Sequence, residues 1–237
     1  MQTSAVDSSR SEATGRMKER ATSRLQCRVT DELRWDPRLD ATRISVSVDE
    51  AIVTLTGKVP SYAQKCCAQL LARRVRGVAG VNDGLEVRLT IGDHRSDAAL
   101  GRLAVDILES LPAMFPERPH VRVHDGWVTL DGIVDSNPLK HAAEEAFVHI
   151  AGIRGITNQI AVVPRSRSSE ARREFVAAVR RSAAVDVADF STKVSGATIV
   201  VRGTVGSCLE HDLLLEMASR APGIARVEDH IVVRPHD

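Results

Sequence analysis

Hydrophobic and polar residues alternate in three short stretches of the chain, and the three stretches resemble one another. The first reads Val-Thr-Leu-Thr from Val53. This period of two is typical of a strand with one buried face. The alternation returns in Val-Thr-Leu-Asp from Val128 and in Ile-Val-Val-Arg from Ile199. We therefore expect three equivalent strands.

A pair of glycines twenty residues apart marks each of the three copies. The pairs are Gly57 with Gly77, Gly132 with Gly152, and Gly203 with Gly223. The first glycine ends the strand and the second follows a predicted helix, and no gap is needed to align them. This spacing indicates a tandem repeat. We interpret the six glycines as a structural motif that permits turns and close backbone approach, and not as ligand contacts.

Each copy contains further predicted elements. An alternating stretch before the marked strand predicts a hairpin, and the expected turns are Asp49-Glu50, Asp125-Gly126 and Ser195-Gly196. After the first glycine, apolar residues from Leu139 to Ile150 of the second copy recur at helical spacing. A last strand follows the second glycine. A further helix precedes each hairpin, at roughly 17–34, 97–110 and 168–182.

The elements predict an α+β fold built of three tandem small modules. Each module has the order helix-strand-strand-helix-strand, with a three-stranded mixed sheet covered by helices on one face. We expect a disordered N-terminal arm at residues 1–16. The modules are expected to span 17–91, 92–164 and 165–237, the third being the most divergent.

The motif residues of the repeat resemble the BON domain, named for bacterial OsmY and nodulation proteins. The first copy carries the pattern as Ile44-Ser-Val-Ser-Val48, as Val53-Thr-Leu-Thr-Gly57-Lys-Val59 and as Gly77-Val78-Ala-Gly-Val81-Asn82. The second copy is nearly as close. The third departs from the pattern, with Arg226 in place of a glycine. The resemblance covers nearly everything after about Met17.

This resemblance implies a non-enzymatic binding or tethering protein that associates peripherally with phospholipid or membranes. Many members of the family are exported and linked to osmotic or envelope stress. In this sequence, the first 24 residues have no apolar run that could form a signal-peptide core. Nowhere do roughly 18 apolar residues follow one another. We therefore expect a cytoplasmic protein without a transmembrane segment, peripheral to the membrane and connected to stress.

Composition and motifs argue against several other functions. The 32 basic and 31 acidic residues leave a net charge of +1, which gives no overall field to attract nucleic acid. The Gly77-Val-Ala-Gly80 segment matches the loop of KH domains only formally, because it joins a helix to a strand. No nucleophile–base, zinc-protease or phosphate-loop motif occurs. We predict no catalytic activity, no cofactor, no metal site and no nucleic-acid partner.

The most basic segment lies near the N-terminus. If the protein attaches to an anionic surface, the expected contacts are Arg16, Lys18, Arg20 and Arg24. Interfacial membrane helices carry a large apolar face, whereas the residues after Arg16 have a poor apolar stripe. The favoured alternative is a tail that runs into the leading helix of the first module.

Two other functions stay open at this point. A cytosolic sensor would bind an ion or small ligand in a pocket between modules. A scaffold would bind another protein through its exposed sheet edges. Cys66 lies off the helix stripe and would be reactive only if its pKa were lowered, whereas Cys67 lies on the stripe and is expected to be buried. The sequence defines neither the ligand nor the oligomeric state.

Overall fold

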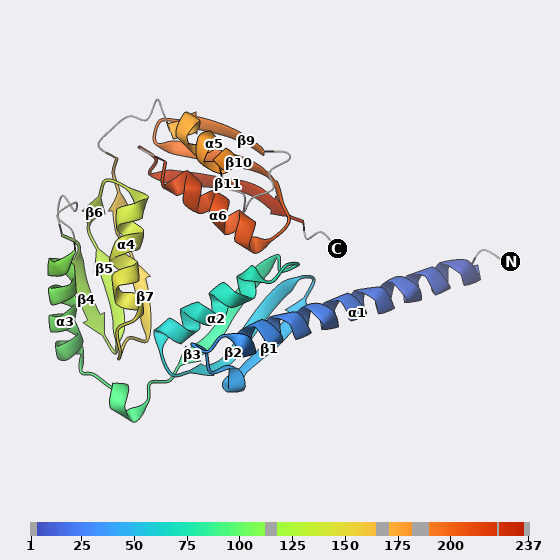
Figure 1. The fold of residues 1–237 in the computed structure, drawn as a ribbon, viewed down its shortest axis with the longest axis horizontal. Coiled ribbons are helices and arrows are strands. Elements are labelled where there is room, and N and C mark those ends of the chain that lie inside the picture. Colours follow the sequence, from blue (N-terminus) through green and yellow to red (C-terminus); the bar gives the residue numbers. More distant parts are fainter. Residues whose placement is uncertain (1–3, 112–117, 165–170, 182–189, 222, 235–237) are drawn as a thin grey trace.

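Three modules, each with its own sheet and its own core, lie around a common centre in the computed structural model (Figure 1). The structure describes residues 4–111, 118–164, 171–181, 190–221 and 223–234, without the side chains of residues 4–19, 171, 172, 174 and 180. The predicted α+β fold of three tandem modules is confirmed.

Module 1 has the predicted order of elements. They are α1 (Ser4–Trp35), the 3-10 turn η1 (Ala41–Arg43), β1 (Ile44–Asp49), β2 (Ile52–Val59), α2 (Tyr62–Arg74) and β3 (Gly80–Val87). The central strand β2 pairs antiparallel with β1 and parallel with β3. The parallel pair needs a crossover, which α2 supplies. Because α1 contacts both β1 and α2, the two helices cover the same face of the sheet.

Modules 2 and 3 repeat this arrangement. Module 2 contains the turn η2 (Ile91–Asp93), α3 (Asp97–Ser110), β4 (His120–His124), β5 (Trp127–Asp131), β6 (Ile133–Val134), α4 (Asn137–Val148), β7 (Gly155–Asn158) and β8 (Ala161–Val162). Module 3 contains α5 (Ala171–Arg181), β9 (Phe190–Ser195), β10 (Thr198–Val205), α6 (Cys208–Ser219) and β11 (Arg226–Val233). In module 2, Gly132 with its φ of +141° separates β5 from β6, so the sheet is divided into β4-β5-β7 and β6-β8.

The bounds of the leading helix match the prediction in module 2, whereas those of the first leading helix differ from it. Helix α3 has the predicted bounds, but α1 begins at Ser4 and includes most of the segment predicted to be a disordered arm. The predicted start at Met17 is therefore too late. No proline interrupts residues 4–16, and α1 continues through them from the part that packs on module 1. The expected ends of the third leading helix, 168–170 and 182, lie outside the described residues.

The hairpin turns lie one residue later than predicted in modules 1 and 3. Asp49 pairs with Ile52, so the turn residues are 50 and 51, with φ of +44° and +70°. Ser195 pairs with Thr198, which places the third turn at 196 and 197. The turn of module 2 lies at 125 and 126 as predicted. The strand pairing, which places apolar residues in the core, fixes these positions.

Neighbouring modules contact one another through core residues and hydrogen bonds. Cys208 of α6 belongs to the core of module 1, and its backbone N–H donates to the Val78 carbonyl oxygen at 3.2 Å. Tyr62 of α2 packs against the core of module 2. The Asn137 side chain of α4 donates to the Ser219 carbonyl oxygen of module 3 at 3.2 Å. Helices α2, α4 and α6 thus form the contacts between modules (Figure 1).

Candidate functional site

The six predicted motif glycines differ in backbone conformation. Five of them have φ between +74° and +141°, namely Gly57, Gly77, Gly132, Gly152 and Gly223. A Cβ on Gly57 would lie 2.0 Å from the Arg43 carbonyl oxygen, so no other residue fits without a backbone shift. Gly203 lacks a positive φ. Gly152 also lines a small pocket between the linker and the turns of module 2.

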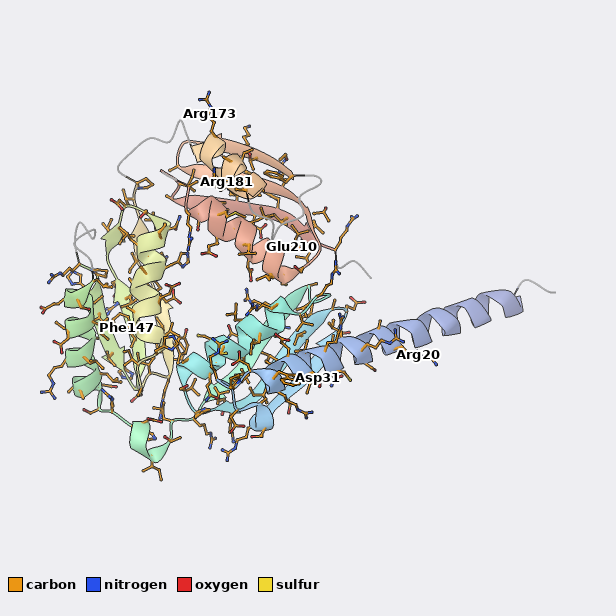
Figure 2. The ribbon with its side chains drawn as sticks, in the orientation of Figure 1. Arg20, Asp31, Phe147, Arg173, Arg181 and Glu210 are labelled. Atoms are coloured by element: carbon orange, nitrogen blue, oxygen red, sulfur yellow. The ribbon has the colours of Figure 1, made fainter. Side chains whose placement is uncertain are left out.

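Helix α1 exposes a row of arginines. Arg20, Arg24 and Arg28 are exposed and lie four residues apart, so they are neighbours along the helix. The residues that pack α1 against its module are Leu25, Val29 and Leu33, all buried. Figure 2 shows Arg20 on the part of α1 that projects beyond the body of module 1. The side chains of Arg16 and Lys18 lie outside the described residues.

Strand β3 leads into the linker that enters α3 (Figure 1). An open cleft lies there between modules 1 and 2. Its volume is about 900 Å³, within the range of small-molecule sites. The lining residues are Lys65, Leu85, Glu86, Val87, Arg88, Leu89, His94, His124, Asp125, Trp127 and Arg154. We call this region the 1–2 cleft. It is a pocket between modules of the kind that a ligand sensor requires.

The linker between modules 1 and 2 is fixed where it borders the 1–2 cleft. The two carboxylate oxygens of Asp97 accept hydrogen bonds from the backbone N–H groups of Asp125 and Gly126, at 2.8 and 2.9 Å. These hydrogen bonds lower the pKa of Asp97, and the bond from Gly126 has the larger effect. A Cβ on Gly152 would lie 3.2 Å from the Asp93 carbonyl oxygen. The linker therefore packs closely on the turns of module 2.

Trp127 is a half-exposed aromatic side chain with a fixed position in the 1–2 cleft. Its Nε1–H donates to Thr157 Oγ1 at 2.7 Å on the neighbouring strand β7. A Cβ on Gly155 would lie 2.6 Å from the indole ring, so the ring rests on the Gly155 backbone. The side chain is 49% exposed, which leaves ring surface free to contact a ligand.

Sequence reasoning did not identify the 1–2 cleft, although Trp127 carried a signal. The equivalent first residues of the other central strands are Ile52 and Thr198. An outward-facing tryptophan is conspicuous in a chain with 3% aromatic residues. The cationic residues Arg88 and Arg154 carried no comparable signal, because they come from two modules and meet only through tertiary packing.

A network of charged side chains joins module 3 to module 1. Arg73 Nη1 of α2 lies 2.8 Å from Asp212 Oδ2 of α6. His211 Nδ1 lies 3.3 Å from Asp212 Oδ1, and His211 Nε2 lies 2.8 Å from Asp229 Oδ2 of β11. The hydrogen bonds to Asp212 and Asp229 raise the pKa of His211 above 6.5, although burial opposes them. Burial raises the pKa of Asp212, but the bonds from His211 and Arg73 outweigh it and lower that pKa.

Raising the pH from about 6 to about 9 is expected to destabilise module 3. The raised pKa of His211 means that its stabilising contribution is complete below 6.5 and is lost as the pH rises through the folded-state value. Urea denaturation at both pH values measures the change. The His211→Gln variant serves as control, because it keeps a polar side chain without the titration. A pH dependence of equal size in His211→Gln would show that other groups cause it.

The remaining candidates from the sequence do not form reactive sites. Burial raises the pKa of Cys66, the opposite of what thiolate reactivity requires. Cys67 is partly buried and packs against the core of module 1. In the part of the chain that the structure describes, no group of three or more metal-binding side chains occurs. None of its described helices is long and apolar enough to cross a membrane.

Comparison with known proteins adds a family match and a relative. The BON domain profile matches residues 21–88, 98–164 and 168–235. Osmotically-inducible protein Y from Escherichia coli (strain K12) is 35% identical over 127 residues, which cover 52% of this chain and 63% of that protein. The match therefore spans less than two thirds of that relative's length.

Solved structures align with the chain at low similarity. CdsD, a structural protein of the type III secretion system of Chlamydia trachomatis, aligns over 89% of this chain and 92% of its own, at 13% identity and a TM-score of 0.25. The PrgH periplasmic domain aligns over 83% of this chain and 97% of its own, at 9% identity and a TM-score of 0.21. Neither similarity bears on function.

Proposed function

Because the chain belongs to the BON domain family, we propose that it is a non-catalytic tethering protein that attaches to anionic phospholipid surfaces through helix α1. The 35% sequence identity over 127 residues with a protein named as osmotically inducible supports a connection with stress. The observation that carries the membrane proposal is the arginine row of Arg20, Arg24 and Arg28 on α1, all exposed.

The geometry of α1 suits contact with a flat charged surface. Its packing residues lie in the C-terminal half, from Leu25 onward, while the N-terminal half projects from the body (Figure 1). Each arginine near an anionic membrane contributes roughly 1 kcal/mol of binding free energy. By its spacing, position 16 would continue this row along the same helix, whereas position 18, the other predicted contact, falls on a different side of it. Attachment by charge alone predicts binding that salt weakens.

Sedimentation with liposomes tests the membrane proposal. The full chain is expected to bind anionic vesicles at low salt and to dissociate from them at high salt. It is not expected to bind neutral vesicles. Replacing Arg20, Arg24 and Arg28 with glutamine should weaken binding roughly 100-fold, from about 1 kcal/mol per arginine. Circular dichroism should show an unchanged fold, because all three side chains are exposed.

A matched variant removes three cations elsewhere. Lys193, Arg202 and Arg234 are exposed residues of module 3, and their replacement by glutamine lowers the net charge equally. This control is expected to bind vesicles nearly as well as the native chain. If both variants lose affinity to the same extent, overall charge and not α1 governs attachment. Failure of the native chain to bind under every condition would overturn the membrane proposal.

A further inference from the structure

The 1–2 cleft combines positive charge with a flat aromatic surface. Three cationic side chains line it, those of Lys65, Arg88 and Arg154, against the two carboxylates of Glu86 and Asp125. Two imidazoles, of His94 and His124, add positive charge when protonated. Cationic side chains thus outnumber carboxylates among the residues that line the cleft. This surface belongs to modules 1 and 2 and shares no residue with the arginine row of α1.

The cations of the 1–2 cleft differ in how far they are already paired. Lys65 Nζ lies 2.9 Å from Asp83 Oδ2 and donates to the Leu85 carbonyl oxygen at 2.7 Å. Arg88 Nε is 3.8 Å from Glu86 Oε2 in a loose, largely exposed pair. Arg154 forms none of the ion pairs found among the described residues, although its charge acts on the Asp97 carboxylate. Arg88 and Arg154 are therefore the groups available to bind an anion, and guanidinium groups suit the oxygens of phosphate.

The position of Arg154 is built into the hairpin of module 2. Its backbone N–H donates to the Gly126 carbonyl oxygen at 2.9 Å. The aliphatic part of its side chain lies over Gly126, where an added Cβ would be 3.3 Å from Arg154 Cγ. The start of the side chain is thus fixed beside Trp127, the next residue of the same hairpin.

Trp127 supplies an aromatic surface on which a ligand ring could stack. The hydrogen bond to Thr157 and the contact with Gly155 fix the indole ring, so a planar ligand group could stack on it without ordering a mobile side chain. Stacking on aromatic side chains is the general mode by which proteins hold unpaired bases. Phosphate alone would use the arginines but leave this surface uncovered.

We infer that the 1–2 cleft binds a small anion that carries a planar ring, and that nucleoside phosphates are the chemical class that fits it. The ring stacks on Trp127 and the phosphate contacts Arg88 and Arg154. The volume of about 900 Å³ accommodates a ligand of this size. Because the walls come from two modules, the bound ligand stabilises their mutual arrangement.

Intrinsic fluorescence tests this inference directly. The chain has two tryptophans, and Trp35 is 85% exposed outside the 1–2 cleft, so the Trp35→Phe variant leaves Trp127 as the reporter. Adenosine monophosphate is expected to quench Trp127 saturably. Adenosine keeps only the ring that stacks on Trp127, and inorganic phosphate keeps only the group that contacts the arginines. Each is expected to bind at least about tenfold more weakly than the nucleotide. Inorganic phosphate that competes as well as the nucleotide would overturn the role of the ring.

Arginine variants test the proposed contacts with the phosphate group. Replacing Arg88 and Arg154 with glutamine in the Trp35→Phe background should weaken nucleotide binding at least about tenfold. The matched control replaces Arg202 and Arg234, exposed residues of module 3, and should leave the affinity unchanged. Absence of saturable quenching by any nucleoside phosphate, or equal binding by the two double variants, overturns the inference. Vesicle binding through α1 is a separate measurement and does not depend on either outcome.

Discussion

Replacing Gly57 with alanine should destabilise module 1 by about 2–4 kcal/mol. Gly57 has a φ of +127°, and a Cβ there would lie 2.0 Å from the Arg43 carbonyl oxygen. The overlap is with backbone, so no side-chain rotation relieves it. Strand β2 or the start of β1 must move, although both pair along their length. Urea denaturation measures the loss, and hydrogen exchange of the β2 amides shows whether it is confined to module 1.

Gly101 offers a matched glycine-to-alanine change. It lies inside helix α3, and an added Cβ would meet nothing within 4 Å. Alanine is favoured over glycine in helices, so Gly101→Ala should stabilise the protein by about 0.5–1 kcal/mol. The opposite signs of the two substitutions separate a backbone requirement from a general effect of removing glycine. Equal stability of Gly57→Ala and the native chain would contradict the geometry of the β1–β2 pair.

The parts of the fold that local pattern determines could be predicted from the sequence. The alternation around Val53 predicts a strand with one buried face, and Val53 and Leu55 are indeed buried. Helix α3 has the predicted bounds because Ser96 caps it at Ala99 N–H and an apolar stripe runs its full length. The start of α1 could not be predicted in this way, because residues 4–16 have no apolar stripe and helix propensity alone does not mark where a helix begins.

The 1–2 cleft could not be predicted, because its walls depend on how two modules pack. Lys65 and Arg154 are separated by more than one whole repeat and line the same cavity only when the linker folds against module 2. The contacts that hold it there, such as Asp97 with the 125–126 turn, are absent from the repeat pattern. A repeat alignment identifies what the modules share, whereas this cleft is formed by what distinguishes module 2, above all Trp127.

Replacing Phe147 with alanine should destabilise module 2 by about 3–5 kcal/mol, the usual cost of removing a buried phenylalanine. Phe147 on α4 is 1% exposed within the core of module 2 (Figure 2). The hydrogen bonds of Asn137 and the packing of Tyr62 join this module to its neighbours. These contacts are few compared with each module's own core, so we expect module 2 to unfold before modules 1 and 3.

Two probes distinguish separate from joint unfolding of this variant. In the Trp35→Phe background, Trp127 fluorescence reports on module 2, while far-ultraviolet circular dichroism reports on the whole chain. For Phe147→Ala the fluorescence transition should occur at lower urea concentration than most of the circular dichroism change. Coincident transitions would show instead that the intermodule contacts of α2, α4 and α6 make the three modules one cooperative unit, because loss of one core would then unfold all of them.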